Sequence, residues 1–89
     1  AYVIDVRPNM IYKMGTIKGA INIPIAEIRS RLDEIPRDKK VILSCNTGYT
    51  SYCASRILAQ KGFNNVYSFM GGYELYKVLV KESAKLNHA

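Results

Sequence analysis

Cysteine and histidine are scarce in this 89-residue chain, which holds two cysteines and one histidine. Two cysteines form at most one disulfide, and this excludes a disulfide-stabilised scaffold. Together with the single histidine they are also too few for a structural zinc site, so no metal site is expected. A reactive thiol in a reducing compartment is the use that remains for a cysteine.

Long apolar runs are absent as well. No run approaches the roughly 18 residues that a membrane-spanning helix needs. The start of the chain also lacks the basic, apolar and small-residue segments of a secretory signal. The hydrophobic share of 48% and the charged share of 22% are typical of a globular protein. We therefore expect a soluble, cytoplasmic domain with no membrane partner.

Acidic residues are outnumbered: seven Asp and Glu stand against thirteen Lys and Arg, and the net charge is +6. This excess favours encounters with anions through the summed field, although a merely basic surface has the same composition. The basic residues are scattered and no nucleic-acid motif accompanies them. Small anions are therefore expected as partners, and nucleic acid is not.

Four runs rich in β-branched or apolar residues are expected to form strands, at residues 2–6, 20–23, 41–44 and 66–69. Residues 10–18 lack clear periodicity and are expected to form a loop with about one helical turn.

Apolar residues at helical spacing predict the helices. Ile25, Ile28, Leu32 and Ile35 predict an amphipathic α-helix that stops at Pro36. Two further helices are expected over residues 52–60 and 75–80. We assign residues 1–80 to one domain and residues 81–89 to a polar C-terminal tail that frays.

The alternation of strands and helices predicts an α/β fold with a central, mostly parallel sheet flanked by helices. Active sites of such sheets lie at the carboxyl ends of the strands. Cys45 directly follows the expected strand at 41–44, so its thiol is expected to lie at such an end.

The loop after Cys45 is suited to stabilise a thiolate. Gly48 permits backbone angles closed to other residues, and either Thr50 or Ser51 is expected to cap the helix that follows. Loop amides and a helix N-terminus lower the pKa of a thiol. The alternative is a buried structural cysteine followed by an ordinary turn.

Five segments occur in the order and spacing of the rhodanese-like domain family, which the chain therefore resembles over nearly its whole length. The similarity is strongest to the rhodanese domain at the C-terminus of flavoproteins of the coenzyme A disulfide reductase and NADH oxidase type. The segments are Ile4–Arg7, Gly15–Pro24, Cys45–Ser51, Gly62-Phe63 and Gly71–Tyr73.

The resemblance implies a rhodanese-type sulfurtransferase or persulfide carrier. Cys45 would take sulfane sulfur from thiosulfate, a polysulfide or a persulfide, hold it as a cysteine persulfide, and pass it to cyanide or a thiol. Asp5 and Arg7 would brace the loop beneath the site. No metal or organic cofactor is implied. The loop that binds the substrate would comprise Asn46, Thr47, Gly48, Tyr49, Thr50 and Ser51.

Three positions depart from the family's pattern. Thr50 stands where an arginine is frequent, Thr16 where a histidine is common, and Tyr76 where a tryptophan is common. Without the arginine, thiolate stabilisation and the binding of a dianion are expected to weaken. The alternative function is a rhodanese-like binding or regulatory module with little turnover.

Other chemistries fit the residues less well. Related phosphatases and arsenate reductases need an arginine at the end of a longer loop, and Ser51 takes that place. Cys53 is a candidate resolving thiol, but its position on the apolar stripe of the expected helix favours core packing. His88 lies in the tail and is expected to be inert.

Family members usually carry a helix and a strand before the segment Ile4–Arg7, and this chain begins without them. It is expected to be either a fragment of a longer polypeptide or a domain with a shortened start. In the first case a reductase domain of the same parent chain becomes a partner, and FAD and coenzyme A enter only through that parent. The sequence leaves the oligomeric state open.

Overall fold

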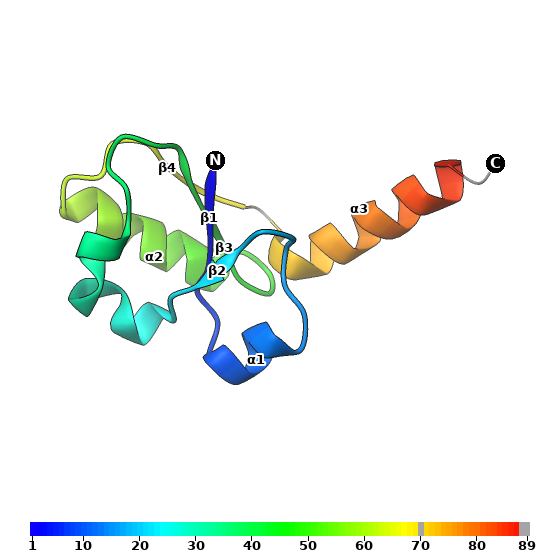
Figure 1. Ribbon diagram of the computed structural model, residues 1–89, viewed down its shortest axis with the longest axis horizontal. Helices are drawn as coiled ribbons and strands as arrows, with labels where there is room; N and C mark the ends of the chain where they lie inside the picture. Colours follow the sequence, from blue (N-terminus) through cyan, green and yellow to red (C-terminus); the bar gives the residue numbers. More distant parts are fainter. Residues whose placement is uncertain (70, 88–89) are drawn as a thin grey trace.

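The computed structural model describes residues 1–69 and 71–87 of the chain and contains a four-stranded sheet with helices around it (Figure 1). In chain order the elements are β1 (Tyr2–Asp5), α1 (Asn9–Lys13), β2 (Ile21–Asn22), the 3-10 helices η1 (Ile25–Ser30) and η2 (Leu32–Glu34), β3 (Val41–Ser44), α2 (Tyr49–Gln60), β4 (Val66–Ser68) and α3 (Gly72–Asn87).

The strands lie in the order β2-β1-β3-β4, and every pair is parallel. The register places Ile4 opposite Leu43 and Asp5 opposite Ser44. β1 and β3 are the central strands, and this explains their buried, apolar residues. The predicted α/β fold with a parallel sheet is confirmed, and the central strand at 41–44 has the predicted bounds.

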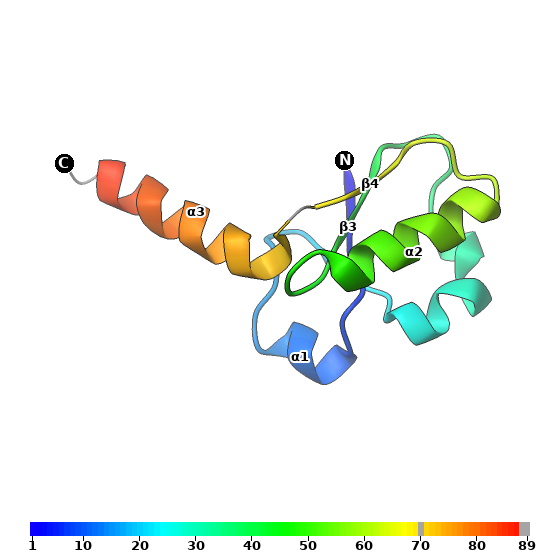
Figure 2. The same cartoon turned by 180° about the vertical axis from the view of Figure 1, so that it is seen from behind.

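The core lies between the sheet and the helix α2, which packs against β3, β4 and η1 (Figure 2). Every side chain at its centre is at most 4% exposed. Because aliphatic side chains fill this layer, the sheet fixes the position of each strand end. The largest fully buried aliphatic residues are Ile4, Val6, Ile23, Ile28, Val41, Leu43 and Leu58.

The predicted amphipathic α-helix over residues 25–35 is wrong. Its place is taken by η1 and η2, which are separated at Arg31, where φ is −123°. The apolar residues occur as two pairs, each three residues apart, and a 3-10 turn brings residues three apart onto one side. The interruption at Arg31 supplies the additional residue between the pairs.

Two other helix bounds differ from the prediction. α2 begins at Tyr49, and the residue before it is Gly48, with φ of 109°, so neither Thr50 nor Ser51 is the cap. α3 runs from Gly72 to Asn87, past the boundary predicted at residue 80. The extension contains Lys, Glu, Ala and Leu, which favour helix. His88 lies outside the described residues.

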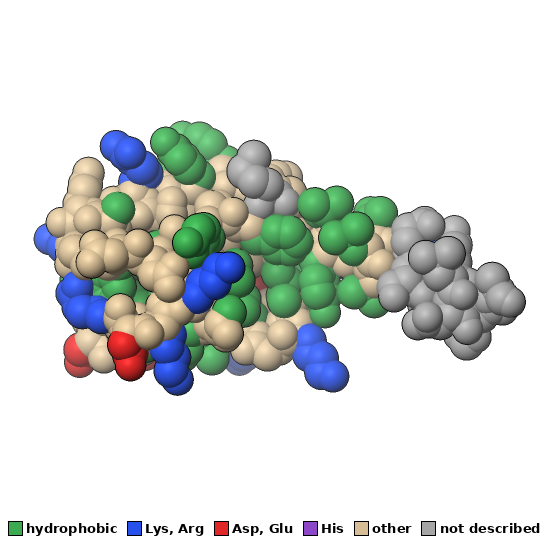
Figure 3. Space-filling model, turned by 90° about the horizontal axis from the view of Figure 1, so that it is seen from above, with side chains coloured by type: hydrophobic (Ala, Val, Ile, Leu, Met, Phe, Trp, Pro, Cys, Tyr) green, Lys and Arg blue, Asp and Glu red, His purple; other side chains and the backbone are tan. Residues whose placement is uncertain are grey.

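α3 projects from the sheet along the long axis of the molecule (Figure 1). Figure 3 shows hydrophobic side chains gathered along its first half, where Leu75 is 39%, Val78 54%, Leu79 52% and Val80 49% exposed. Across residues 1–69 and 71–87, no helix combines the length and the apolar character needed to cross a membrane.

Candidate active site

Cys45 is the first residue after β3, at the carboxyl end of a central strand, and it is 2% exposed. The chain turns sharply there, because Gly48 adopts a positive φ that brings its amide back toward the cysteine. The Gly48 amide donates a 3.0 Å hydrogen bond to Cys45 Sγ. Strand, loop and helix N-terminus therefore meet at the sulfur.

Ser51 lies in the first turn of α2, is fully buried and contacts the same sulfur. The Cys45 thiol donates to Ser51 Oγ at 3.5 Å, and Ser51 Oγ donates to the Gly48 carbonyl at 3.0 Å. Ser51 Oγ is also 2.6 Å from Ser68 Oγ on β4, and either hydroxyl can donate. The expected helix cap is thus a neighbour of the sulfur instead.

The pKa of Cys45 is lowered from the ordinary value of 9.0. Burial alone raises the pKa, since it penalises the charged form. Hydrogen bonds from the Ser51 hydroxyl and from the backbone amides of Ser51, Gly48 and Thr47 outweigh burial by stabilising the thiolate. The loop therefore favours the nucleophilic form of the thiol.

Asp5 and Arg7 form a buried ion pair beneath the loop. Arg7 Nη2 is 2.6 Å from Asp5 Oδ2, and the two side chains are 6% and 1% exposed. Arg7 also donates to Asn46 Oδ1 at 3.0 Å and to the Gly15 carbonyl at 2.6 Å. The guanidinium thereby joins β1, the cysteine loop and the segment before β2.

Thr16, which takes the family's histidine position, donates from Oγ1 to Asp5 Oδ2 at 2.6 Å. Burial raises the pKa of Asp5, but the hydrogen bonds from Arg7 and Thr16 lower it by more, so its pKa lies below the usual value of 3.8. Asp5 is therefore held as a carboxylate under the cysteine loop.

The start of α3 is fixed to the cysteine loop through the main chain. The amides of Tyr73 and Glu74 donate to the carbonyls of Cys45 and Asn46 at 2.6 and 3.1 Å. Gly72 has φ of +55°, and a Cβ on it would overlap the Cys45 carbonyl and lie 2.7 Å from the Asn46 carbonyl carbon. Only a glycine fits between the loop and α3.

The side chains of the remaining loop residues do not contact Cys45 Sγ. Tyr49 is 75% exposed, and Asn46 and Thr47 are exposed as well, although the Asn46 side chain accepts from Arg7. Thr50 is half-buried in the first turn of α2. The structure thus brings Gly48, Ser51 and the Thr47 amide to the sulfur, and it leaves Tyr49 in solvent.

Sequence reasoning missed Ser68, Gly72 and Tyr73 as neighbours of the site. Ser68 lies opposite Leu43 in the β4–β3 register, and its signal was a serine within an otherwise apolar strand. Cys53, expected to pack in the core, is half-buried and free, whereas the adjacent Ala54 is fully buried. Cys45 is also free.

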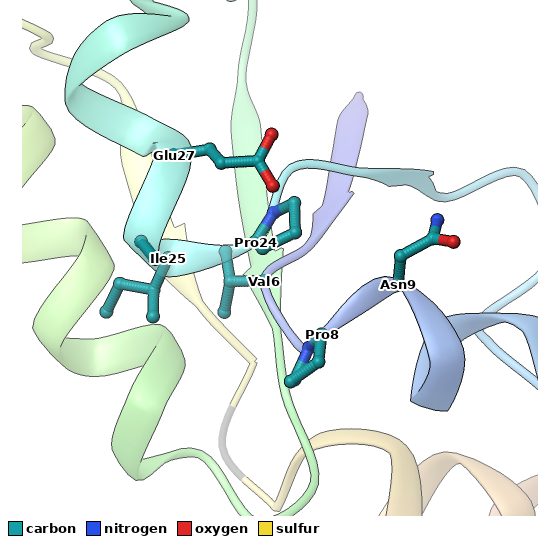
Figure 4. A pocket seen from close by; sticks show the side chains of 7 residues that line it. Val6, Pro8, Asn9, Pro24, Ile25 and Glu27 are labelled. Atoms are coloured by element: carbon teal, nitrogen blue, oxygen red, sulfur yellow. The ribbon is translucent and has the colours of Figure 1, made fainter.

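Two recesses flank the carboxyl edge of the sheet. One, of about 210 Å³, adjoins the cysteine loop and is lined by Arg7, Ile11, Met14, Gly15, Asn46, Tyr73, Glu74 and Lys77. The other, of about 260 Å³, is mainly apolar and is lined by Val6, Pro8, Asn9, Pro24, Ile25, Ala26 and Glu27 (Figure 4). Among the described residues, no three His, Cys, Asp or Glu side chains gather as metal ligands.

Comparison with known proteins identifies the fold that carries this cysteine. The sequence model of the rhodanese-like domain matches residues 1–78. The chain belongs to the rhodanese-like domain family. This confirms the family predicted from the loop and its flanking segments.

Some relatives of this rhodanese-like domain are named as sulfurtransferases. The domain is 35% identical over 77 residues to the thiosulfate sulfurtransferase GlpE of Pseudomonas fluorescens, a match that covers 86% of this chain and 71% of the relative. Such relatives support a role in sulfur transfer at the level of the family.

Solved structures of larger proteins also contain the rhodanese-like domain. The reduced CoADR-RHD of Bacillus anthracis aligns with a TM-score of 0.84 at 44% identity, over 91% of this chain and 14% of that one. An NAD-dependent persulfide reductase from A. fulgidus aligns with a TM-score of 0.69 at 44% identity, over 80% of this chain and 13% of that one. The chain therefore spans about a seventh of the length of these structures.

Proposed function

We propose that this rhodanese-like domain is a sulfurtransferase that carries sulfane sulfur as a persulfide on Cys45. The observation that carries the proposal is the hydrogen bond from the Gly48 amide to Cys45 Sγ, in a loop whose donors lower the pKa of the thiol. A thiolate is the form that attacks sulfur.

The first half-reaction loads the cysteine. The Cys45 thiolate attacks the outer sulfur of thiosulfate, a sulfur–sulfur bond forms, and the bond to the departing sulfite breaks with its electron pair. A polysulfide or a persulfide donates in the same way and releases a chain shorter by one sulfur, or a thiolate. The terminal sulfur then carries the negative charge, and loop amides are suited to stabilise it.

The second half-reaction regenerates the thiolate. Cyanide or an acceptor thiolate attacks the terminal sulfur, and Cys45 departs as the thiolate. Thiocyanate or a new persulfide is released. The two half-reactions balance in electrons as sulfur–sulfur exchange, so the cycle requires no metal or organic cofactor.

Asp5 and Arg7 act as support in this proposal. Their buried pair holds the Asn46 side chain and the segment at Gly15, so it fixes the loop that presents the sulfur. The basic chain, with a net charge of +6, also favours the approach of anionic donors. A reductase domain of the same parent chain is proposed as the partner, as in the larger reductases to which this chain is similar.

The second candidate is a binding or regulatory module with little turnover. Two observations favour it: Cys45 is 2% exposed, and Thr50 supplies no cation at the helix start. Such a module would keep the fold and release sulfur slowly or not at all.

Intact mass after incubation with polysulfide or thiosulfate distinguishes the two. We expect the mass to rise by one sulfur atom or more in the wild type and in Cys53→Ala, and to stay constant in Cys45→Ala. A wild-type mass that is unchanged with both donors contradicts sulfur transfer. A mass that rises but does not fall when cyanide or a thiol is added supports the module.

A further inference from the structure

Ser68 lies on β4, outside the cysteine loop, yet its hydroxyl reaches the site. Ser68 Oγ is 2.6 Å from Ser51 Oγ and 3.5 Å from the Gly48 carbonyl oxygen. Ser51 is fully buried, and Ser68 is half-buried behind it. Because the parallel register places Ser68 opposite Leu43, the sheet itself holds this hydroxyl beside the end of β3.

The proton of the Ser51 hydroxyl has competing acceptors. In the thiol form Cys45 donates to Ser51 Oγ, and Ser51 donates to the Gly48 carbonyl. When the thiol proton leaves to solvent, the sulfur becomes an acceptor and the Ser51 hydroxyl must turn toward it. Ser51 Oγ then needs a donor for the lone pair that accepted from the thiol, and Ser68 Oγ lies 2.6 Å away.

We infer that Ser68 is a positioning residue for the chemistry at Cys45: its hydroxyl donates to Ser51 Oγ and so directs the Ser51 hydroxyl toward the sulfur. Chains of hydrogen bonds polarise one another inside a protein, so the Ser51 donor becomes stronger when Ser68 donates to it. The inference rests on the proposed function, because it matters where Cys45 works as a thiolate or as a persulfide anion.

Ser68 acts through Ser51 and not by its own charge. Glu74 and Lys77 line the recess beside the loop, and Arg7, whose guanidinium interacts electrostatically with Cys45, forms an ion pair with Asp5 beneath it. A hydroxyl substitution on β4 leaves that pair intact. A change in the pKa of Cys45 in such a variant is then due to the hydrogen bond between Ser68 and Ser51.

The test measures the ionisation of Cys45 in a Cys53→Ala background, from the pH dependence of iodoacetamide alkylation. Ser68→Ala is expected to raise the apparent pKa of Cys45 and to lower the thiolate fraction, at a pH below that pKa, about threefold, the factor for half a pKa unit. Ser55→Ala is the matched control, because Ser55 is half-buried like Ser68 but bonds the Tyr52 carbonyl instead. It is expected to leave the profile unchanged.

A second pair of variants separates the effect of the Ser68 hydroxyl from the effect of the side-chain volume that Ser68→Ala removes. Ser68→Thr retains the hydroxyl. Ser68→Val introduces a side chain of nearly the same shape as threonine that lacks the hydroxyl. Ser68→Thr is expected to keep the wild-type profile and Ser68→Val to shift it. Equal profiles for the two contradict the inference, as does an unshifted profile in a folded Ser68→Ala.

A double-mutant cycle separates action through Ser51 from a direct effect. Ser68→Ala is expected to shift the profile in the presence of Ser51 and to have no further effect in Ser51→Ala. Shifts that add would show that Ser68 acts without Ser51, which overturns the inference. The alkylation assay uses no sulfur donor, so its outcome is distinct from failure of the proposed sulfur transfer.

Discussion

The Tyr73 amide donates a 2.6 Å hydrogen bond to the Cys45 carbonyl oxygen, and this bond seats the first turn of α3 on the cysteine loop. The approach is close because Gly72, the residue before Tyr73, has no side chain. The geometry of the sulfur site therefore depends on a segment far from it in the sequence.

Gly72→Ala is expected to disturb the cysteine loop. The new Cβ would overlap the Cys45 carbonyl, and the positive φ is itself strained for alanine. We expect a loss of roughly 2–5 kcal/mol in the free energy of unfolding from strain and overpacking together, with lower persulfide formation. Denaturant unfolding and intact mass measure the two effects.

Gly19→Ala is the matched control for this change. Gly19 has φ of +86°, but nothing lies within 4 Å of a Cβ built on it. It is therefore expected to show the backbone strain alone, about 1–2 kcal/mol, with persulfide formation retained. Equal losses for the two variants would mean that the contact with Cys45 has no effect.

Asp5→Asn is expected to destabilise the fold by about 3–5 kcal/mol, because it leaves the buried Arg7 guanidinium without its carboxylate. Urea unfolding measures the loss. Glu34→Gln, in the exposed pair with Arg31, is the control and is expected to change stability little. A small loss for Asp5→Asn would show that the pair does not hold the loop.

The Asp5 carboxylate also makes the free energy of unfolding depend on pH in the acidic range. The pKa of Asp5 is lower in the folded chain than the 3.8 of an ordinary carboxyl, so its contribution is complete above that pH and is lost as the pH falls through the folded pKa. Unfolding midpoints measured against pH are expected to fall less steeply in Asp5→Asn. Parallel curves would rule out this linkage.

The ionisation of Cys45 is expected to shift when the chain unfolds. In Cys53→Ala, the midpoint of the alkylation pH profile should lie lower in the native protein than in urea, where the loop donors are lost. Since the folded pKa is the lower one, this group stabilises the fold above the unfolded pKa, and the contribution is lost as the pH falls through the folded pKa. Coincident midpoints would mean that the loop does not stabilise the thiolate.

Thr50→Arg restores a cation at the half-buried start of α2. It is expected to increase the rate of persulfide formation with thiosulfate, a dianion, more than with an uncharged trisulfide. The gain should shrink as ionic strength rises. Thr50→Gln is the uncharged control, and an equal gain for Gln and Arg would exclude electrostatics as the cause.

The sequence alone predicts those parts of the site that lie within one short segment of the chain. The strand at 41–44 and the position of Cys45 after it follow from an apolar run that ends in small and polar residues. The role of Gly48 as the turn also has a local signal, because a loop that curls back needs a positive φ.

For the other half of the site, no local pattern shows which residues lie near Cys45. Ser68 and Tyr73 reach the cysteine loop only through the β3–β4 register and the contact of α3 with the loop. The spacing of apolar residues along the chain does not predict which distant segments pair. The α-helix expected at Ile25 failed for a related reason. A spacing of three, four and three suits one α-helix or two 3-10 turns, and packing against α2 selects between them.

The all-parallel sheet has a consequence for the order in which the molecule assembles. Parallel neighbours cannot be joined by a tight turn, so β1 meets β3, and β3 meets β4, only after long intervening segments have closed. The groups around Cys45 come from all of these segments. The donors that lower the pKa of Cys45 lie within the loop itself, whereas Asp5, Arg7 and Ser68 reach that loop only once β1 and β4 have paired with β3. The complete site is therefore assembled only together with the whole sheet.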